Sequence, residues 1–344
     1  MNPMTTMIII SSLATGTIIT ASSFHWFMAW IGLEMNTLAI IPIISKQHHP
    51  RATEAATKYF LTQAAASALI LFSSMINSWH LGTWDITQTM NQTSSILLTI
   101  ALAMKLGLAP THFWLPEVLQ GTTMTTALII STWQKLAPMT LIYLTANNLS
   151  PTTLLLMGTL STCVGGWGGI NQTQTRKMMA YSSIAHLGWM AAISPMLTNI
   201  MMLNLTIYIL MTTSMFMILI TTKSKTLQNL TTLWTLSPAM TTMTLLTLLS
   251  LGGLPPLSGF MPKWLILNEL INQKFIITTT IMTMATLLSL FFYLRLTYIT
   301  TLTLPPNTPN TTYKWRFKPI SPMLLTITIP MTLMILPMTP TITQ

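Results

Sequence analysis

The sequence carries very little charge. Charged residues make up only 6% of the 344 residues, against about 25% in ordinary soluble domains. Hydrophobic residues make up 51%, so the chain cannot cover itself with a water-soluble surface. Because a helix that crosses the hydrocarbon core needs roughly 20 residues, the length predicts an all-α membrane protein with about eleven transmembrane helices.

Other absences exclude whole classes of site. The single cysteine, Cys163, rules out a disulfide framework and a cysteine cluster for zinc or iron and sulfur. No phosphate-binding Gly-x-x-x-x-Gly-Lys motif occurs, and no strand precedes the glycine cluster at 165–169 as a dinucleotide site requires. The first apolar run has no basic region ahead of it, which argues against a cleaved leader and predicts a first span. We therefore expect neither a metal nor a bound cofactor in this chain.

Apolar runs separated by short polar or proline-rich breaks predict eleven spans. Their centres fall near Ile10, Glu34, Leu69, Leu102, Lys135, Leu160, His186, Ile209, Leu249 with its continuation through Leu265, Met284 and Thr328. If these spans alternate in direction, 11 of the 15 basic residues fall in loops on one side of the membrane, where Glu54 is also expected to be a loop residue. These basic residues are Lys46, Arg51, Lys58, Arg176, Lys177, Lys223, Lys225, Arg295, Lys314, Arg316 and Lys318. Loops on the other side hold only Lys274. Basic loops collect on the cytoplasm-like side, so this asymmetry predicts an N-terminus on the basic side.

The basic residues also indicate what surrounds the chain. The formal net charge of +10 is explained by the basic loops of a membrane protein, which favour anionic lipid head groups as neighbours. It does not imply a nucleic-acid partner.

Two similar segments, 106–110 and 252–256, each interrupt a span with glycine and proline. Proline removes a backbone donor and disrupts the preceding turn, so both segments predict a broken helix. Pro110 and Pro256 are 146 residues apart, close to the 148 residues between Pro3 and Pro151. The pattern predicts two inverted five-span repeats, 1–148 and 149–300, followed by a loop and a final span in 301–344. The alternative is that prolines are simply frequent in membrane helices.

Four ionisable residues stand inside the apolar spans. Glu34 lies in the middle of the second span, Lys105 just before the first break, and Lys135 in the middle of the fifth span. Lys263 follows the second break by seven residues. An ionisable group at membrane depth is costly unless it is paired or hydrated, so each is a candidate functional residue. We expect Glu34 to pair with Lys105.

These residues are suited to proton transfer. Burial favours the neutral form of a lysine and a nearby carboxylate favours the charged form, so a change of hydration or pairing moves the proton. His112, after the first break, and His186, in the middle of a span, are possible relays. The alternatives are structural ion pairs, lysines that extend to the interface, and hydrogen-bonded core histidines. Glu117 is expected to cap or close the broken region.

The whole chain resembles the antiporter-like membrane subunits of respiratory complex I, in the shorter form found in animal mitochondria. The resemblance rests on the runs Gly32-Leu33-Glu34-Met35-Asn36, Lys105-Leu106-Gly107-Leu108-Ala109-Pro110-Thr111-His112-Phe113-Trp114 and Gly253-Leu254-Pro255-Pro256-Leu257-Ser258-Gly259-Phe260, with Lys135 and Lys263. It implies that Glu34 and Lys105 form the pair that gates proton movement. It also implies that Lys135 is the bridge, that Lys263 faces the exit, and that His112 and His186 line a hydrated axis.

The resemblance has wider implications for the setting of the chain. It implies the inner mitochondrial membrane, with the N-terminus and basic loops in the matrix and the C-terminus in the intermembrane space. Partners would be neighbouring antiporter-like and accessory subunits and an anionic lipid such as cardiolipin. NADH, FMN, iron–sulfur clusters and ubiquinone would be bound by other subunits. Bacterial members carry three more N-terminal spans, so another subunit is expected to pack against the first span here.

Two other readings of the same residues remain open. The inverted repeat and the buried charges would serve a stand-alone cation/proton antiporter equally well. A scaffold that keeps the charges as structural pairs and pumps nothing is the second alternative.

Overall fold

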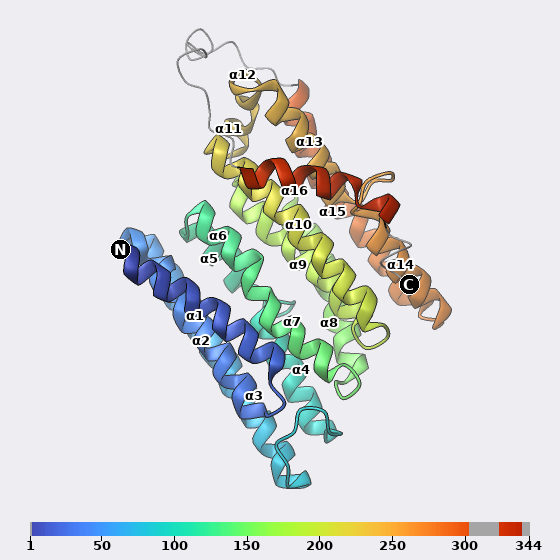
Figure 1. The fold of residues 1–344 in the computed structure, drawn as a ribbon. Helices are drawn as coiled ribbons and strands as arrows, with labels where there is room; N and C mark the ends of the chain where they lie inside the picture. The colour runs from blue at the N-terminus through green and yellow to red at the C-terminus, as the bar shows by residue number, and fades with distance from the viewer. Residues whose placement is uncertain (1, 303–322, 339–344) are drawn as a thin grey trace. The chain divides into compact units, whose positions relative to one another are not determined.

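The computed structural model describes residues 2–302 and 323–338, and the regular elements of these residues are helices, with two isolated β-bridges. Figure 1 shows the ribbon coloured along the chain. The chain divides into two compact units. Unit 1 comprises Met1–Ser161 and Ala191–Thr198, and unit 2 comprises Thr162–Met190 and Asn199–Gln344. Each unit is described by itself.

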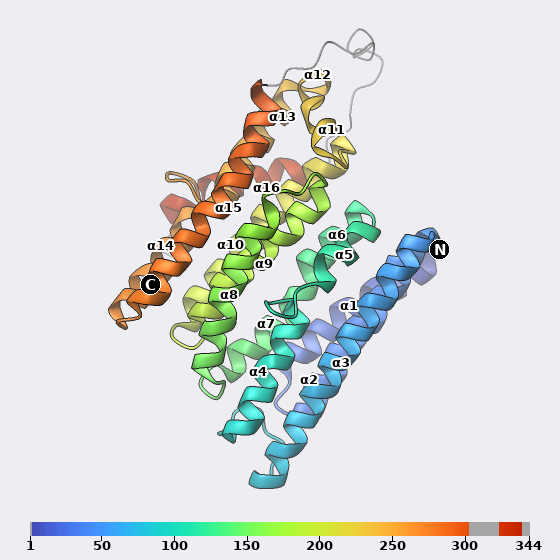
Figure 2. The same ribbon diagram turned by 180° about the vertical axis from the view of Figure 1, so that it is seen from behind.

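Unit 1 is built around three long helices that lie side by side, α1, α2 and α3, as Figures 1 and 2 both show. Shorter helices pack against them, with α5 on α3 and α7 on α1, α2 and α4. The bounds are α1 Pro3–Ser22, α2 Trp26–Ile44, the short η1 Ser45–Gln47, α3 Pro50–Leu81, α4 Gln92–Leu106, α5 Trp114–Gly121, α6 Met124–Ser131 and α7 Trp133–Thr145. Helix α8, Pro151–Gly169, begins in unit 1 and ends in unit 2.

Helices α1 and α2 cross where each has a glycine. A Cβ added at Gly16 would lie 2.9 Å from the carbonyl oxygen of Gly32, and one at Gly32 would lie 2.8 Å from that of Gly16. The two backbones therefore approach closely, as small residues allow in membrane helix pairs. This contact fixes α2, which carries Glu34, against α1.

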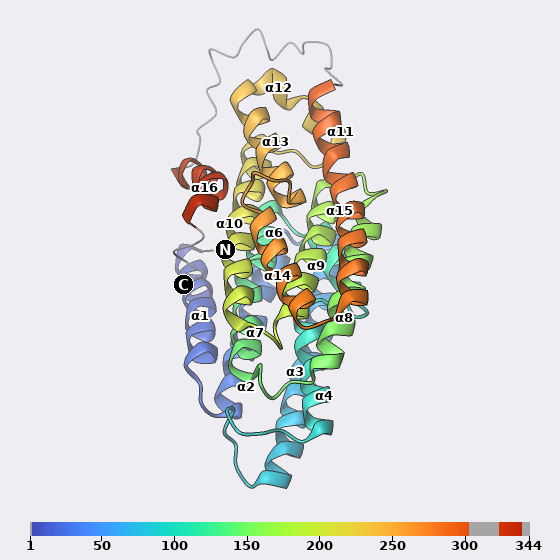
Figure 3. The same cartoon turned by 90° about the vertical axis from the view of Figure 1, so that its right-hand side faces the viewer.

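Unit 2 contains the end of α8 and the helices that follow it, except that the end of α9 and the first residue of α10 belong to unit 1. They are α9 Thr175–Ile193, α10 Thr198–Thr222, α11 Leu227–Thr231, α12 Leu233–Leu236, α13 Pro238–Gly252, α14 Phe260–Asn272, α15 Ile276–Leu302, α16 Met323–Met334 and the short η3 Leu336–Met338. Helices α13 and α14 both pack on α15. Ile218 of α10 packs with Leu325 and Ile329 of α16, and Figure 3 shows α16 beside α10.

The two predicted helix breaks are confirmed. Helix α4 ends at Leu106, and Gly107 follows with a φ of 79°. Helix α13 ends at Gly252, and Gly253 follows with the same φ. Only glycine adopts this left-handed conformation readily, so it ends each helix as a C-terminal cap. After each break a second, short helix begins, α5 in unit 1 and α14 in unit 2.

The fifth predicted span is also interrupted, which the sequence did not predict. It forms two helices, α6 and α7, which meet at Thr132. Both the amide and the hydroxyl of Thr132 donate to the carbonyl of Leu128, at 3.0 and 2.7 Å. A threonine hydroxyl that bonds back to the preceding turn bends a helix. The interruption lies just before Lys135 and so helps to set its position.

The helices match the predicted spans in place. Each of the eleven predicted centres falls within a helix. Among the described residues, five helices, α1, α2, α3, α10 and α15, are each long and apolar enough to cross a membrane, and α4 and α13 are shorter apolar helices. The all-α membrane class is therefore confirmed, and the number of crossings stays a prediction. Three predicted basic loop residues, Lys314, Arg316 and Lys318, lie outside the described residues.

Candidate functional site

The end of α4 is the structural centre of the site in unit 1. The amides of Gly107 and Leu108 both donate to the carbonyl of Ala103, at 2.9 Å each, and so close the last turn. The last carbonyls of a helix lack partners within it and carry the negative end of its dipole. The ammonium of Lys135, on α7, donates a hydrogen bond to one of them, the carbonyl oxygen of Leu106. The broken helix thus supplies the oxygen that holds a buried lysine.

Lys105 and Lys135 line one small cavity. Lys135 is 1% exposed and Lys105 is 4% exposed. The cavity has a volume of about 10 Å³, close to the room that a single water molecule needs. Its other walls come from α2, α3, α5, α6 and α7, through residues that include Asn36, Tyr59, Gln63, Trp114, Ile130 and Gln134.

Three polar side chains at this cavity have buried groups without a hydrogen-bond partner in the protein. The Lys105 ammonium, the Asn36 amide and the Gln63 amide nitrogen are buried and make no side-chain hydrogen bond. Buried polar groups almost always have a partner, and ordered water is the usual one where the protein supplies none. The cavity is therefore suited to a hydrated route rather than to a dry core.

Glu34 lies on α2 directly after Leu33, which lines the cavity, and it makes no hydrogen bond with Lys105. One of its carboxylate oxygens is buried without a hydrogen bond, and the Lys105 ammonium has none either. Lys105 and Tyr59 are both within electrostatic reach of Glu34. The expected Glu34–Lys105 pair is thus absent as a hydrogen-bonded contact, and its formation during turnover stays a prediction.

Unit 2 repeats the contact between a lysine and the end of a helix. The ammonium of Lys263, on α14, donates to the carbonyl oxygen of Gly252 at 2.8 Å. Gly252 is the last residue of α13, as Leu106 is the last residue of α4. In both units a lysine therefore binds the carbonyl directly before the left-handed glycine.

His186 lies beside Lys263 in unit 2. The two residues line a cavity of about 10 Å³ together with Ala185, Trp189, Ser289 and Tyr293. The His186 ring is buried and lies 5.7 Å from the ring of Tyr208, and Lys263 is within its electrostatic reach. The two residues therefore share one polar pocket, as a relay requires.

His112 is buried in the segment between α4 and α5, but it does not line the cavity of unit 1. Its ring lies 4.2 Å from the ring of Phe113, and its Nδ1 makes no hydrogen bond. Its role as a relay stays a prediction.

Several lining residues carry no charge, and sequence reasoning gave them no role. In unit 1, the Tyr59 hydroxyl donates to Gln134 at 3.4 Å, and Gln134 donates to the carbonyl of Asn36 at 3.3 Å. Trp114 covers Lys135, whose ammonium lies 5.6 Å from the ring centroid. The sequence feature that could have identified such residues is a side-chain amide in an apolar span near a buried charge, as at Asn36 and Gln134.

The sequence of the chain is similar to those of known proteins along its whole length. Residues 23–289 match the family model described as NADH:quinone oxidoreductase/Mrp antiporter, TM, and residues 290–343 match NADH dehydrogenase subunit 2 C-terminus. NADH-ubiquinone oxidoreductase chain 2 of Varanus timorensis is 58% identical over 345 residues, covering 100% of both chains. That of Xenopus laevis is 56% identical over 341 residues, covering 99% of both.

The chain belongs to the NADH-ubiquinone oxidoreductase chain 2 family. A chain of respiratory complex I from Thermus thermophilus has a TM-score of 0.83 and 26% identity, over 96% of this chain and 78% of that one. A chain of the Mrp complex from Dietzia sp. has a TM-score of 0.79 over 88% of this chain and 61% of that one, and its 16% identity supports a shared fold alone. The family resemblance given by the motifs is confirmed.

Proposed function

We propose that the chain is a proton-translocating core membrane subunit of NADH:ubiquinone oxidoreductase in the inner mitochondrial membrane. Electron transfer from NADH to ubiquinone in other subunits would drive it. Members of its family are named as chains of that enzyme. The proton route would use Glu34, Lys105, Lys135 and Lys263, with His112 and His186 as relays.

The observation that carries this proposal is the lysine bound to the carbonyl end of a broken helix in each unit. The free carbonyls and the helix dipole stabilise a charged lysine, whereas burial stabilises a neutral one. The two protonation states are thereby brought closer in free energy than either influence alone would allow. Such a lysine can gain a proton from water in its cavity and lose it again.

Lys105 fits a different role from Lys135. Its ammonium faces the same cavity but has no hydrogen-bond partner, and Glu34 is its nearest source of negative charge on α2. A small movement of α2 or α4 that brought Glu34 into contact would favour the charged form of Lys105, and separation would favour the neutral form. We propose that this pair controls when a proton passes to Lys135.

The predicted topology belongs to the same proposal. Eleven spans in two inverted five-span repeats would place the N-terminus and basic loops in the matrix and the C-terminus in the intermembrane space. Helices α1 and α8 begin at Pro3 and Pro151, and both breaks are followed by a short helix, which supports the repeat. The boundary at 148/149 differs from the division of the compact units inside α8, so the repeat remains part of the proposal.

The setting follows from the family. NADH, FMN, iron–sulfur clusters and ubiquinone would be bound elsewhere in the assembled complex. Partners would be neighbouring antiporter-like and accessory membrane subunits, with an anionic lipid such as cardiolipin at the basic loops. A stand-alone antiporter would show cation-dependent proton movement by the isolated chain in liposomes.

The test is proton pumping per NADH oxidised by the assembled complex, reconstituted in vesicles and carrying Lys105→Met. Methionine fills a similar volume but cannot carry a proton, so we expect pumping to be lost while assembly persists. Assembly is measured on the same sample. Unchanged pumping would mean that the buried charges are structural pairs and that the chain is a scaffold.

A further inference from the structure

Each broken helix is followed by an ionisable residue at the same distance from its left-handed glycine, and the two residues have opposite charges. Lys263 lies ten residues after the left-handed Gly253 and directly after Pro262, and Glu117 lies ten residues after Gly107 and directly after Pro116. In unit 2 the lysine at this position binds the carbonyl of Gly252. In unit 1 the glutamate instead points to the surface, where its side chain is 51% exposed.

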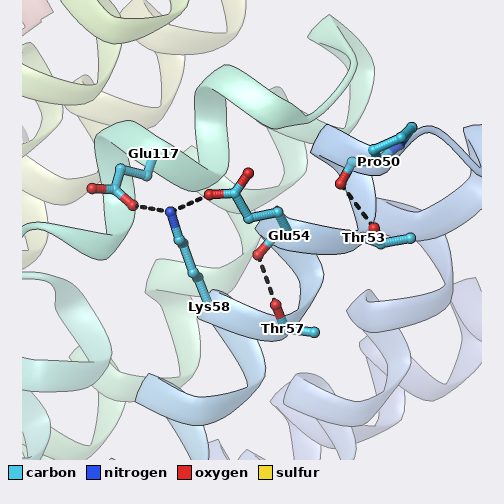
Figure 4. Close-up of polar contacts among 6 residues, drawn as sticks. All are labelled: Pro50, Thr53, Glu54, Thr57, Lys58 and Glu117. Atoms are coloured by element: carbon cyan, nitrogen blue, oxygen red, sulfur yellow. Dashed lines mark hydrogen bonds and ion pairs between the residues drawn. The ribbon is translucent and has the colours of Figure 1, made fainter.

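Glu117 takes part in a bridge of three charged residues. The Lys58 ammonium lies 2.6 Å from a carboxylate oxygen of Glu117 and 2.5 Å from one of Glu54. Figure 4 marks both contacts with dashed lines. Glu54 and Lys58 belong to α3 and Glu117 to α5. Arg51 on α3 is a further positive charge acting on Glu54. The sequence had placed Glu54 and Lys58 in a loop, so this prediction was wrong.

The bridge lies on a seam along which α5 packs on α3. At one end, a Cβ at Gly121 would lie 2.6 Å from the carbonyl oxygen of Arg51, so the backbones are in close contact there. At the other end, the Trp114 ring lies 5.7 Å from that of Tyr59 in an edge contact. Trp114, Glu117 and Gly121 are spaced to share one face of a helix. The bridge therefore occupies the middle of this face.

The inner end of the seam is a wall of the cavity that holds Lys135. Trp114 and Tyr59 both line this cavity, and Trp114 covers the Lys135 ammonium. Trp114 is buried, whereas Glu117, three residues later on the same face, is exposed. One face of α5 thus carries both the exposed carboxylate of Glu117 and the Trp114 ring that covers the buried Lys135.

We propose that Glu117 is the proton-loading residue at the outer end of a route to Lys135, and that Lys58 is a positioning residue that holds its carboxylate over the α3–α5 seam. This inference rests on the proposed function. Helix α3 begins at Pro50, close to Lys46 in η1, and carries Arg51 in its first turn; these basic residues face the matrix under that proposal, and the bridge therefore faces it too. Protons are taken up from that side.

The steps balance. A hydronium ion gives its proton to the Glu117 carboxylate and leaves as water. The neutral acid releases Lys58, which remains paired with Glu54, and this loosens α5 and Trp114 at the cavity wall. The acid then passes the proton through water to the neutral amine of Lys135, which becomes an ammonium. The regenerated carboxylate binds Lys58 again.

The test uses the assembled complex in vesicles with Glu117→Gln, which keeps the size of the side chain but cannot carry a proton. We expect NADH-driven pumping per assembled complex to fall at least about a hundredfold, the low end of the effect of losing a proton-transfer group. Glu117→Asp is expected to restore much of it. Glu269→Gln is the matched control, because Glu269 is an acid of α14 held by Gln273 at 3.1 Å, and it should leave pumping unchanged.

Lys58→Met and Lys58→Arg test the positioning role. The methionine variant should slow pumping and change its pH profile, whereas arginine, which can still bridge two carboxylates, should restore both. Normal pumping and an unchanged pH profile in Lys58→Met would overturn this role, and normal pumping in Glu117→Gln would overturn the loading role. If Glu117→Gln does not assemble, normal pumping and an unchanged pH profile in the assembled Lys58→Met complex would overturn both roles. Loss of pumping in Lys105→Met with normal pumping in Glu117→Gln would overturn this inference alone.

Discussion

Gly253→Ala should disable the lysine site of unit 2 without a change of any ionisable residue. Gly253 has a φ of 79°, and a Cβ there would lie 2.7 Å from the Lys263 ammonium and 3.0 Å from its Cδ. The end of a lysine side chain is flexible, so it can move away at little steric cost. That movement takes the ammonium off the carbonyl of Gly252.

The size of the effect of Gly253→Ala follows from two separate free-energy costs. Alanine in a left-handed conformation costs about 1–2 kcal/mol. Loss of a hydrogen bond to a charged group costs about 1.5–3 kcal/mol more. The second cost corresponds to roughly a ten- to hundredfold change in occupancy of the Lys263 contact. We expect coupled turnover to fall by about the same factor, because the displaced lysine no longer has the carbonyl that stabilises its charge.

Gly82→Ala is the matched control. Gly82 caps α3 with a φ of 76°, and a Cβ there would meet nothing within 4 Å. It carries the same backbone cost but displaces no side chain. The assay is NADH-driven proton pumping per assembled complex, with thermal stability measured in parallel. If both variants pump alike after correction for assembly, the lysine–carbonyl contact is not part of the route and this reasoning is refuted.

Two further predictions concern α2 and the packing of α8. Glu34→Gln should leave assembly largely intact but slow coupled turnover, because a neutral amide cannot favour the charged form of Lys105 as a carboxylate does; a normal quinone-linked rate would contradict the proposed gate. Gly168→Ala should lower the thermal midpoint of the complex, because its Cβ would overlap the ring of Tyr181 and overpacking costs about 1–3 kcal/mol. Pumping per surviving complex should be normal in that variant, and a pumping defect without loss of stability would contradict a purely structural role.

The breaks could be predicted from sequence because they depend on local chemistry. Proline cannot donate a backbone hydrogen bond, and glycine takes a left-handed conformation at little cost. The pairs Gly107 with Pro110 and Gly253 with Pro256 therefore mark helix ends whatever surrounds them. The interruption at Thr132 depends on which carbonyl its hydroxyl selects, and sequence spacing does not determine that choice.

The buried lysines could also be found from sequence, but their partners could not. Lys135 binds a carbonyl 29 residues away, and Lys58 binds a carboxylate 59 residues away in the chain. These contacts depend on how helices pack. The expectation that the nearest opposite charge would pair with Lys105 gave weight to Glu34 and none to backbone oxygens. Uncharged amides such as Gln63 were given no role from the sequence, because an amide in a span is often bonded only to neighbouring helices.

The two lysine contacts use the same kind of backbone carbonyl, but the lysines come from different places in the chain. Lys135 reaches the end of α4 from a different span, α7, whereas Lys263 reaches the end of α13 from the helix that directly follows the break. What the units have in common is therefore the carbonyl end of a helix stopped by a left-handed glycine. A helix that continued through this point would use those carbonyls in its own hydrogen bonds. The break is thus as necessary to the proposed proton route as the lysines, since it leaves the oxygens that hold them.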